Sequence, residues 1–202
     1  MLNQINIAVL VSGGGTNLQA LINAQDSGII KSGKITLVVS NNKDAYALER
    51  AKKANIETAV LLKKELGSQE IFEDKLIETL KAHNIGLIVL AGFMSILSEK
   101  FTKTFEGRII NVHPSLIPSF CGKGFYGLKV HEEALKYGVK VTGATVHFVN
   151  EIPDGGKIIM QKAVEIQDGD TPEVLQKRVM EQAEWIILPN ATEKVCSELL
   201  KV

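Results

Sequence analysis

Short apolar runs rich in Val, Ile and Leu alternate with segments of helical periodicity along this chain, and this alternation constrains the fold more than any other feature. The run at residues 85–90 is apolar throughout, as in a strand that is covered on both faces. Strands separated by helices predict βαβ units with right-handed crossovers. The runs expected as strands are residues 7–11, 35–39, 57–61, 85–90 and 108–112.

The second half of the chain predicts a different strand arrangement. Residues 141–149 and 158–164 are joined by only a short turn, so we expect them to pair antiparallel. Pro172 opens a last helix, and Pro189 is expected to kink or end it. We therefore expect a single α/β domain over residues 1–202. Its Rossmann-like sheet should be mostly parallel, with helices on both faces and an antiparallel C-terminal strand pair.

Composition excludes several classes of protein. Lys+Arg and Asp+Glu are both 23, which argues against a broad basic face for nucleic acid. The apolar run at residues 5–11 has no basic flank and leads into glycines, so it reads as a first strand rather than a signal peptide, and no stretch is long enough to span a membrane. Cys121 and Cys196 form no metal-ligand spacing and no disulfide framework. We expect free thiols, no metal and a cytoplasmic location.

A glycine-rich loop, Ser12 to Asn17, follows the first strand and precedes a helix. Glycines let backbone N–H groups approach a ligand closely, and a helix N-terminus favours an anion. A dinucleotide site would need glycine where Leu18 stands and an acidic residue where the second strand ends in Ser40 and Asn41, and a Walker A lysine is also missing. The loop therefore suits a phosphate monoester, or it is a glycine turn that binds nothing.

The apolar run at 108–112 ends at polar residues, which include Asn111 and His113. Pro114 cannot continue a central strand, so Asn111 and His113 should lie at the carboxyl edge of the sheet and face the same way. An amide beside an imidazole suits an oxyanion donor with a proton-transfer group; the alternative is a capping residue and an ordinary loop histidine. Asp154 lies in a Pro-Asp-Gly-Gly turn. Near His113 it would raise the imidazole pKa above about 6.5, or it serves the turn alone.

Two further loops carry unusual side chains. The loop at 91–97 holds too many large apolar groups for a solvent loop, so it either packs under the next helix or walls a pocket for a flat ligand. The loop at 119–127 is rich in glycine and contains three aromatic residues, which is typical of a mobile functional loop.

Together these motifs resemble the folate-dependent formyltransferases over nearly the whole chain, and the N-terminal phosphate loop favours the group that acts on glycinamide ribonucleotide. The resemblance implies that the substrate amine attacks the formyl group of 10-formyltetrahydrofolate in purine synthesis, without a metal. The segments that carry it are residues 12–17, 91–97, 111–118, 143–149 and 154–156.

The resemblance also assigns roles to residues. Asn111 would hydrogen-bond the formyl oxygen, His113 would transfer protons, and Asp154 would hold His113 and favour its protonated form. The residues implied for glycinamide ribonucleotide are Gly15, Thr16, Asn17 and Glu184, and those for the folate are Gln69, Met94, Ser95, Ile96, Leu97 and Asn111.

Two residues differ from the pattern of the family, and three histidines have no role in its motifs. Ser95 and Gln69 stand where family members often carry arginine. His83 and His131 are expected to face solvent from helices, and His147 is expected to be structural.

Other functions remain open at this point. A formyltetrahydrofolate hydrolase would share the chemistry, and a sensor that binds a phosphosugar or folate would share only the binding sites. A nucleotide-dependent oxidoreductase is disfavoured by Leu18 and Asn41. The partners expected are small-molecule substrates, without nucleic acid or membrane, and the chain is a monomer or a homodimer.

Overall fold

The computed structural model describes residues 4–201 and contains one seven-stranded sheet with the strand order β3-β2-β1-β4-β5-β6-β7. Strands β1 to β5 pair in parallel, whereas β6 runs antiparallel to β5 and β7 runs antiparallel to β6. The predicted mostly parallel sheet with an antiparallel C-terminal pair is confirmed. The strands are β1 (Ile5–Val11), β2 (Gly33–Ser40), β3 (Glu57–Val60), β4 (Leu87–Leu90), β5 (Ile109–His113), β6 (Val141–Phe148) and β7 (Ile158–Glu165).

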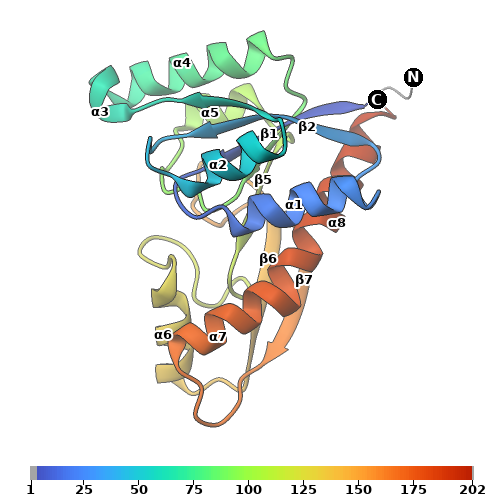
Figure 1. Ribbon diagram of the computed structural model, residues 1–202. Helices are drawn as coiled ribbons and strands as arrows, with labels where there is room; N and C mark the ends of the chain where they lie inside the picture. The colour runs from blue at the N-terminus through green and yellow to red at the C-terminus, as the bar shows by residue number, and fades with distance from the viewer. Residues whose placement is uncertain (1–3, 202) are drawn as a thin grey trace.

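Helices cover both faces of this sheet (Figure 1). Helices α4 and α5 lie on one face, α1, α2 and α8 lie on the other, and α6 and α7 flank the extension formed by β6 and β7. The helices are α1 (Thr16–Asp26), α2 (Tyr46–Lys53), α3 (Lys63–Leu66), α4 (Gln69–Ala82), α5 (Glu99–Thr104), α6 (Leu128–Tyr137), α7 (Pro172–Val179), the π-helical turn η1 (Met180–Glu184) and α8 (Trp185–Leu199).

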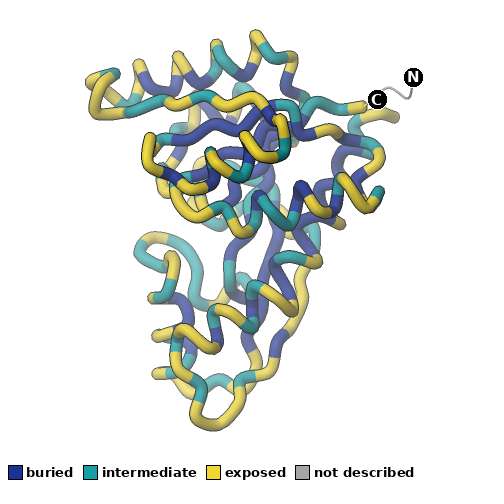
Figure 2. The backbone as a smooth tube through the Cα atoms, viewed as in Figure 1, coloured by how far each residue is buried: buried dark blue, intermediate teal, exposed yellow. Residues whose placement is uncertain are grey.

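The core is divided by the sheet into two clusters. In β1, Ile7, Val9 and Val11 face α1 and α8, whereas Ala8 and Leu10 face α4, as the period of two in a strand requires. All five side chains are fully buried, and Figure 2 shows the buried backbone concentrated in these central strands. The continuous apolar runs read from the sequence are therefore strands covered on both faces.

Local expectations failed at a few places. The short helices α3 and α5 were not predicted, because neither is long enough to show a helical period. Pro189 does not end the last helix, which continues through it to Leu199. It is the fifth residue of α8 after the π-helical turn, so at most one intrahelical donor is lost. Among residues 4–201, no helix has the length and apolarity needed to cross a membrane.

Candidate active site

Asn111 and His113 lie on one face of β5 at its carboxyl end. They follow Ile109 and Ile110, whose buried side chains hold the strand inside the sheet. In the antiparallel register with β6, Asn111 lies opposite His147 and His113 lies opposite Thr145. The strand thus delivers an amide and an imidazole to one edge, as the alternation of side chains predicted.

Asp154 reaches the same edge from the turn between β6 and β7. It has a left-handed backbone (φ 56°), and Gly156 packs so closely that a Cβ there would lie 1.7 Å from the Phe148 carbonyl oxygen. The turn is therefore pinned to the end of β6. Asp154 Oδ2 lies 3.5 Å from His113 Nδ1, and Asp154 Oδ1 lies 3.5 Å from His147 Nε2. The structure brings the predicted trio of side chains together.

The loop at 119–127 closes over this trio. His113 Nε2 donates a hydrogen bond to the Phe120 carbonyl oxygen at 2.8 Å, because a carbonyl can only accept. The Gly122 N–H donates to Asp154 Oδ2 at 2.8 Å. In this conformation the loop occupies one nitrogen of the imidazole and one oxygen of the carboxylate.

The pKa of His113 contradicts one expectation from the sequence. Burial lowers the pKa of His113 below its ordinary value, and the Asp154 charge and the Phe120 hydrogen bond offset only part of that shift. The predicted rise above about 6.5 was therefore wrong, because the covered ring loses more hydration than one carboxylate returns. For Asp154, burial acts to raise the pKa, but the neighbouring His147 and His113 rings and the Gly122 hydrogen bond outweigh it, so the pKa lies below its ordinary value.

His147 is the residue of this site that sequence reasoning missed. Its Nδ1–H donates to the Phe148 carbonyl at 2.8 Å, so Nε2 is an acceptor and receives a hydrogen bond from Asn111 Nδ2 at 3.2 Å. This contact fixes the Asn111 amide and leaves its second N–H available. The alternation of Thr145 and His147 along β6 was the available signal, but its use required the β5–β6 register.

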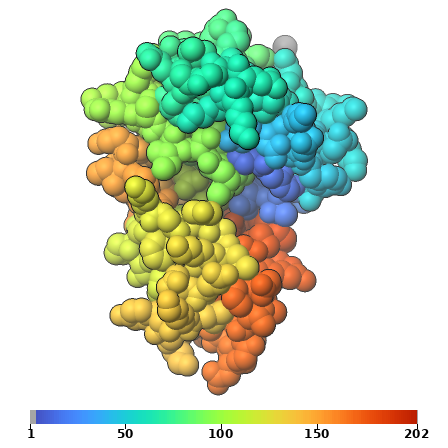
Figure 3. All heavy atoms as spheres, turned by 90° about the vertical axis from the view of Figure 1, so that its left-hand side faces the viewer, coloured from blue at the N-terminus to red at the C-terminus, as the bar shows by residue number. Residues whose placement is uncertain are grey.

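An apolar slot of about 130 Å³ opens beside Asn111, His147 and Asp154. Figure 3 looks onto the face where the segment around residues 120–137 (yellow) meets the segment around 90–110 (green), with a recess between them. The 91–97 loop therefore walls a pocket rather than packing entirely under a helix. The large apolar side chains that line the slot are Leu90, Phe93, Ile96, Leu97, Val149 and Ile152.

The glycine loop before α1 presents backbone donors. Gly15 has φ 71°, and a Cβ at this position would lie 2.6 Å from the Cβ of Ala47. No side chain caps the start of α1, so its first N–H groups are available to an anion. Thr16 is exposed there, with Oγ1 3.9 Å from Met180 Sδ. Met94 N–H donates to Ser12 Oγ at 2.8 Å, which sets the glycine loop against the loop that walls the apolar slot.

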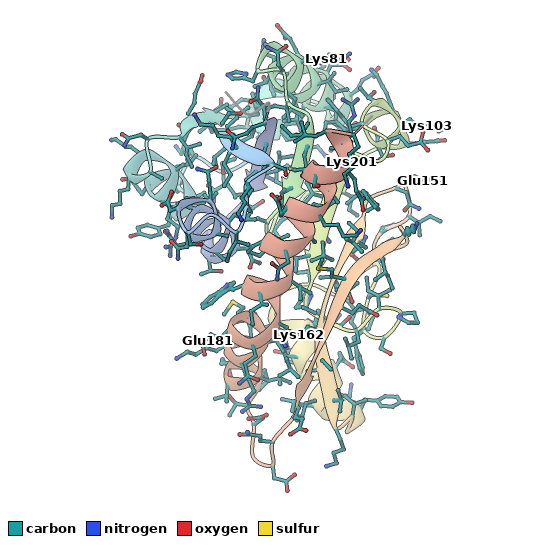
Figure 4. All side chains as sticks on the ribbon, turned by 90° about the vertical axis from the view of Figure 1, so that its right-hand side faces the viewer. Lys81, Lys103, Glu151, Lys162, Glu181 and Lys201 are labelled. Atoms are coloured by element: carbon teal, nitrogen blue, oxygen red, sulfur yellow. The ribbon has the colours of Figure 1, made fainter. Side chains whose placement is uncertain are left out.

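Glu184 joins the glycine loop through Asn17, whose Nδ2 donates to Glu184 Oε2 at 2.7 Å. The carboxyl is almost fully buried, and burial raises its pKa, which the Asn17 hydrogen bond lowers only in part. Figure 4 shows Glu181 on the side of this helical segment that faces away from the sheet, where it pairs with Lys177 at 3.8 Å. The π-helical turn contains both acidic residues, and it directs Glu184, but not Glu181, toward the glycine loop.

Residues 5–192 match the family described as formyl transferase. The chain belongs to this family. Among curated relatives of this formyltransferase, phosphoribosylglycinamide formyltransferase of Haemophilus influenzae is 46% identical over 183 residues, covering 91% of this chain and 83% of the relative. The trifunctional purine biosynthetic protein adenosine-3 of Gallus gallus is 45% identical over 99% of this chain, which spans only 19% of that longer protein.

Solved formyltransferase structures share the whole fold. Glycinamide ribonucleotide transformylase 1 from Symbiobacterium toebii superimposes with a TM-score of 0.90 at 39% identity, covering 96% of this chain and 89% of that one. Phosphoribosylglycinamide formyltransferase from Brucella melitensis gives a TM-score of 0.88 at 39% identity, with coverages of 96% and 97%.

In the formyltransferase, Ser95 and Gln69 each form hydrogen bonds with neighbouring residues. Ser95 Oγ accepts from Asn41 Nδ2 at 2.9 Å. Gln69 Nε2 donates to Glu73 at 2.6 Å and to the Ile96 carbonyl at 3.1 Å, and it does not line the apolar slot. The Met94 side chain is also outside the slot lining and is 59% exposed. Over residues 4–201, no cluster of His, Cys, Asp or Glu is suited to hold a metal ion.

Proposed function

We propose that this protein transfers the formyl group of 10-formyltetrahydrofolate to the amine of glycinamide ribonucleotide in purine synthesis, as a single formyltransferase domain over residues 1–202. Similar proteins that are named phosphoribosylglycinamide formyltransferase and glycinamide ribonucleotide transformylase support formyl transfer to this amine. The observation that carries the proposal is the convergence of Asn111, His113 and Asp154 between a loop of backbone donors and an apolar slot.

The phosphate of glycinamide ribonucleotide would bind at the start of α1. The N–H groups of Gly15, Thr16 and Asn17 lie at a helix N-terminus without a side-chain cap, where the helix dipole favours an anion. Glu184 and Asn17 form an adjacent polar pair, 2.7 Å apart, which suits the hydroxyl groups of the ribose. The amine end of the substrate would then extend toward β5.

The flat ring of the folate would enter the apolar slot. Ile96 and Leu97 supply apolar contacts, and the amide of Asn111 lies beside them. Ser95 and Gln69 provide no cationic group, so we propose that Met94 and Gln69 act mainly by shaping the 91–97 loop through the Ser12 and Ile96 contacts.

The chemistry follows from where the three side chains lie. The amine nitrogen bonds to the formyl carbon, and the carbonyl electron pair moves onto oxygen, where the second N–H of Asn111 stabilises the developing charge. His113 accepts the proton that the nitrogen loses and returns it to N10 of the folate as the C–N10 bond breaks. Asp154 holds Nδ1–H of His113 and stabilises the imidazolium between these two transfers.

This sequence requires the Phe120 carbonyl to leave His113 Nε2. The ring then donates Nδ1–H to Asp154 and presents a free Nε2 to the amine. While the loop covers the ring, burial lowers the pKa of His113 and favours the neutral imidazole, which is the form that must accept a proton once the carbonyl leaves. We further propose that the protein works in the cytoplasm, where Cys121 and Cys196 stay reduced.

Formyl transfer from 10-formyltetrahydrofolate to glycinamide ribonucleotide, followed with purified protein, tests the proposal. We expect turnover that depends on both substrates and gives formylated amine equal to the folate consumed. Equal turnover without the amine would instead indicate a hydrolase. Binding of either ligand without turnover by folded protein would indicate a sensor, and an NADH titration checks the oxidoreductase class.

A further inference from the structure

Arg50 of α2 contacts both the glycine loop and α1. Its Nε donates to the Gly14 carbonyl at 2.8 Å, and its Nη1 donates to Gln19 Oε1 of α1 at 3.0 Å. The guanidinium carbon lies 5.0 Å from the centre of the Tyr46 ring. One turn earlier in the same helix, the Ala47 N–H donates to the Gly13 carbonyl at 3.0 Å. Helix α2 thus binds two successive carbonyl groups of the loop.

These contacts determine where the loop directs its N–H groups. A trans peptide unit is planar, and its C=O and N–H point in opposite directions. The carbonyls of Gly13 and Gly14 point toward α2, so the N–H groups of Gly14 and Gly15 point away from it. Without Arg50, the Gly14–Gly15 peptide would lose the partner that holds its orientation.

Arg50 also supplies charge behind the loop. Its contacts are with a carbonyl, an amide oxygen and an aromatic ring, and none of these three groups carries a charge that would neutralise it. A guanidinium hydrogen-bonded to a carbonyl polarises that peptide, which makes its N–H a better donor. Arginine suits the position because its planar fork reaches two acceptors, on the loop and on α1, at once.

We propose that Arg50 is a positioning residue for phosphate recognition: it orients the Gly14–Gly15 peptide and lends positive potential to the loop without touching the substrate. This inference rests on the proposed function, since it assumes that the phosphate of the amine substrate binds at the loop. It goes further by assigning specificity for the anion to a residue outside the loop.

The test replaces Arg50 with Met, which keeps much of the apolar stem, and with Lys, which keeps the charge but cannot bind both acceptors. Losing one charge-assisted hydrogen bond predicts a KM for glycinamide ribonucleotide raised roughly 10–100-fold in Arg50→Met, with Arg50→Lys in between. The KM for the formyl folate and kcat should change by less than about threefold. The salt dependence of the KM for glycinamide ribonucleotide should be weaker in Arg50→Met than in the wild type.

Arg108→Met is a matched control. Arg108 donates to the Thr104 carbonyl at 3.2 Å and lies 5.4 Å from the Phe105 ring centre, so it makes similar contacts just before the start of β5, at the opposite end of that strand from His113. We expect both KM values to be unchanged in this variant. Melting temperatures of all variants separate a loss of packing from a loss of phosphate recognition.

Titration with ribose 5-phosphate provides a readout that does not need turnover. We expect the wild type to bind it and Arg50→Met to bind it at least about tenfold more weakly. If the wild type binds but shows no formyl transfer, the proposed function fails and this inference stands. An unchanged KM and unchanged ribose 5-phosphate affinity in folded Arg50→Met or Arg50→Lys, or a wild type that binds no phosphate, would overturn the inference.

Discussion

The Asp154 carboxylate lies 3.5 Å from the His113 ring through Oδ2, and the same oxygen accepts a hydrogen bond from the Gly122 N–H at 2.8 Å. One carboxylate therefore links the turn after β6, the end of β5 and the loop over both. Any movement of that loop changes the hydration and the partners of the imidazole together. Loop position and the protonation of His113 are coupled in this arrangement.

Asn111 and His147 should act as one unit. Asn111→Ala removes the donor to the formyl oxygen and should lower kcat by roughly 10²–10³-fold. His147→Ala removes the acceptor that orients the amide, so it should lower kcat by about tenfold. The double variant should be no slower than Asn111→Ala, because orientation is irrelevant without the amide. If kcat of the double variant fell by the product of the two single effects, His147 would act independently of the Asn111 amide.

The pH dependence of turnover should report His113. Because burial lowers the pKa of His113, the acid limb of kcat/KM, where the ring binds a proton and cannot act as a base, should lie at lower pH than the titration of an exposed imidazole. The Asp154 charge raises that pKa, so Asp154→Asn should move the acid limb to still lower pH. Comparing the two profiles with the same substrates cancels the titration of the substrate amine. A limb that moves to higher pH in the variant would contradict this assignment.

The buried carboxyl of Glu184 should lower the folding stability of the protein at neutral and alkaline pH. Burial raises the pKa of Glu184 above its ordinary value, so the folded protein favours the neutral acid and loses stability as pH rises through the folded-state pKa. Glu184→Gln should therefore melt at the same temperature as the wild type near about pH 4 and at a higher temperature near about pH 8. The same variant should raise the KM for glycinamide ribonucleotide. A melting difference that is independent of pH would contradict the burial of a charged group here.

Two neighbouring glycines should respond differently to alanine. Gly15 has φ 71° and no room beside Ala47, so Gly15→Ala should destabilise the fold by about 2–4 kcal/mol and distort the phosphate loop. A methyl group at Gly14 meets nothing within 4 Å, so Gly14→Ala should leave the unfolding free energy nearly unchanged. Urea unfolding of the two variants measures the difference, and equal destabilisation would show that the clash is relieved.

The sheet could be predicted because each buried strand has its own apolar run, and that signal is local in the sequence. The edge position of Asn111 and His113 followed from Pro114 and the period of two. The pKa of His113 could not be predicted, because it depends on a loop that begins several residues later in the chain. His147 required the register between β5 and β6, which a single sequence does not contain.

The burial of His131 is another feature that the sequence did not predict. It was expected to face solvent, but it is fully buried on α6, and burial lowers its pKa to about 4. Val130 and Ala134 share the buried side of this short helix, and His131, three residues before Ala134, lies on the same side. The orientation of α6 depends on its packing against α7, which comes from the far end of the chain.

The kcat of Asp154→Asn at saturating concentrations of both substrates is the most direct test of the chemistry proposed for this edge of the sheet. Asparagine fills the same space, but it cannot stabilise the imidazolium or select the Nδ1–H form of His113. We predict a folded variant that still binds both substrates and whose kcat falls by roughly 10²–10⁴-fold. A kcat within about threefold of the wild type would mean that the carboxylate takes no part in the transfer.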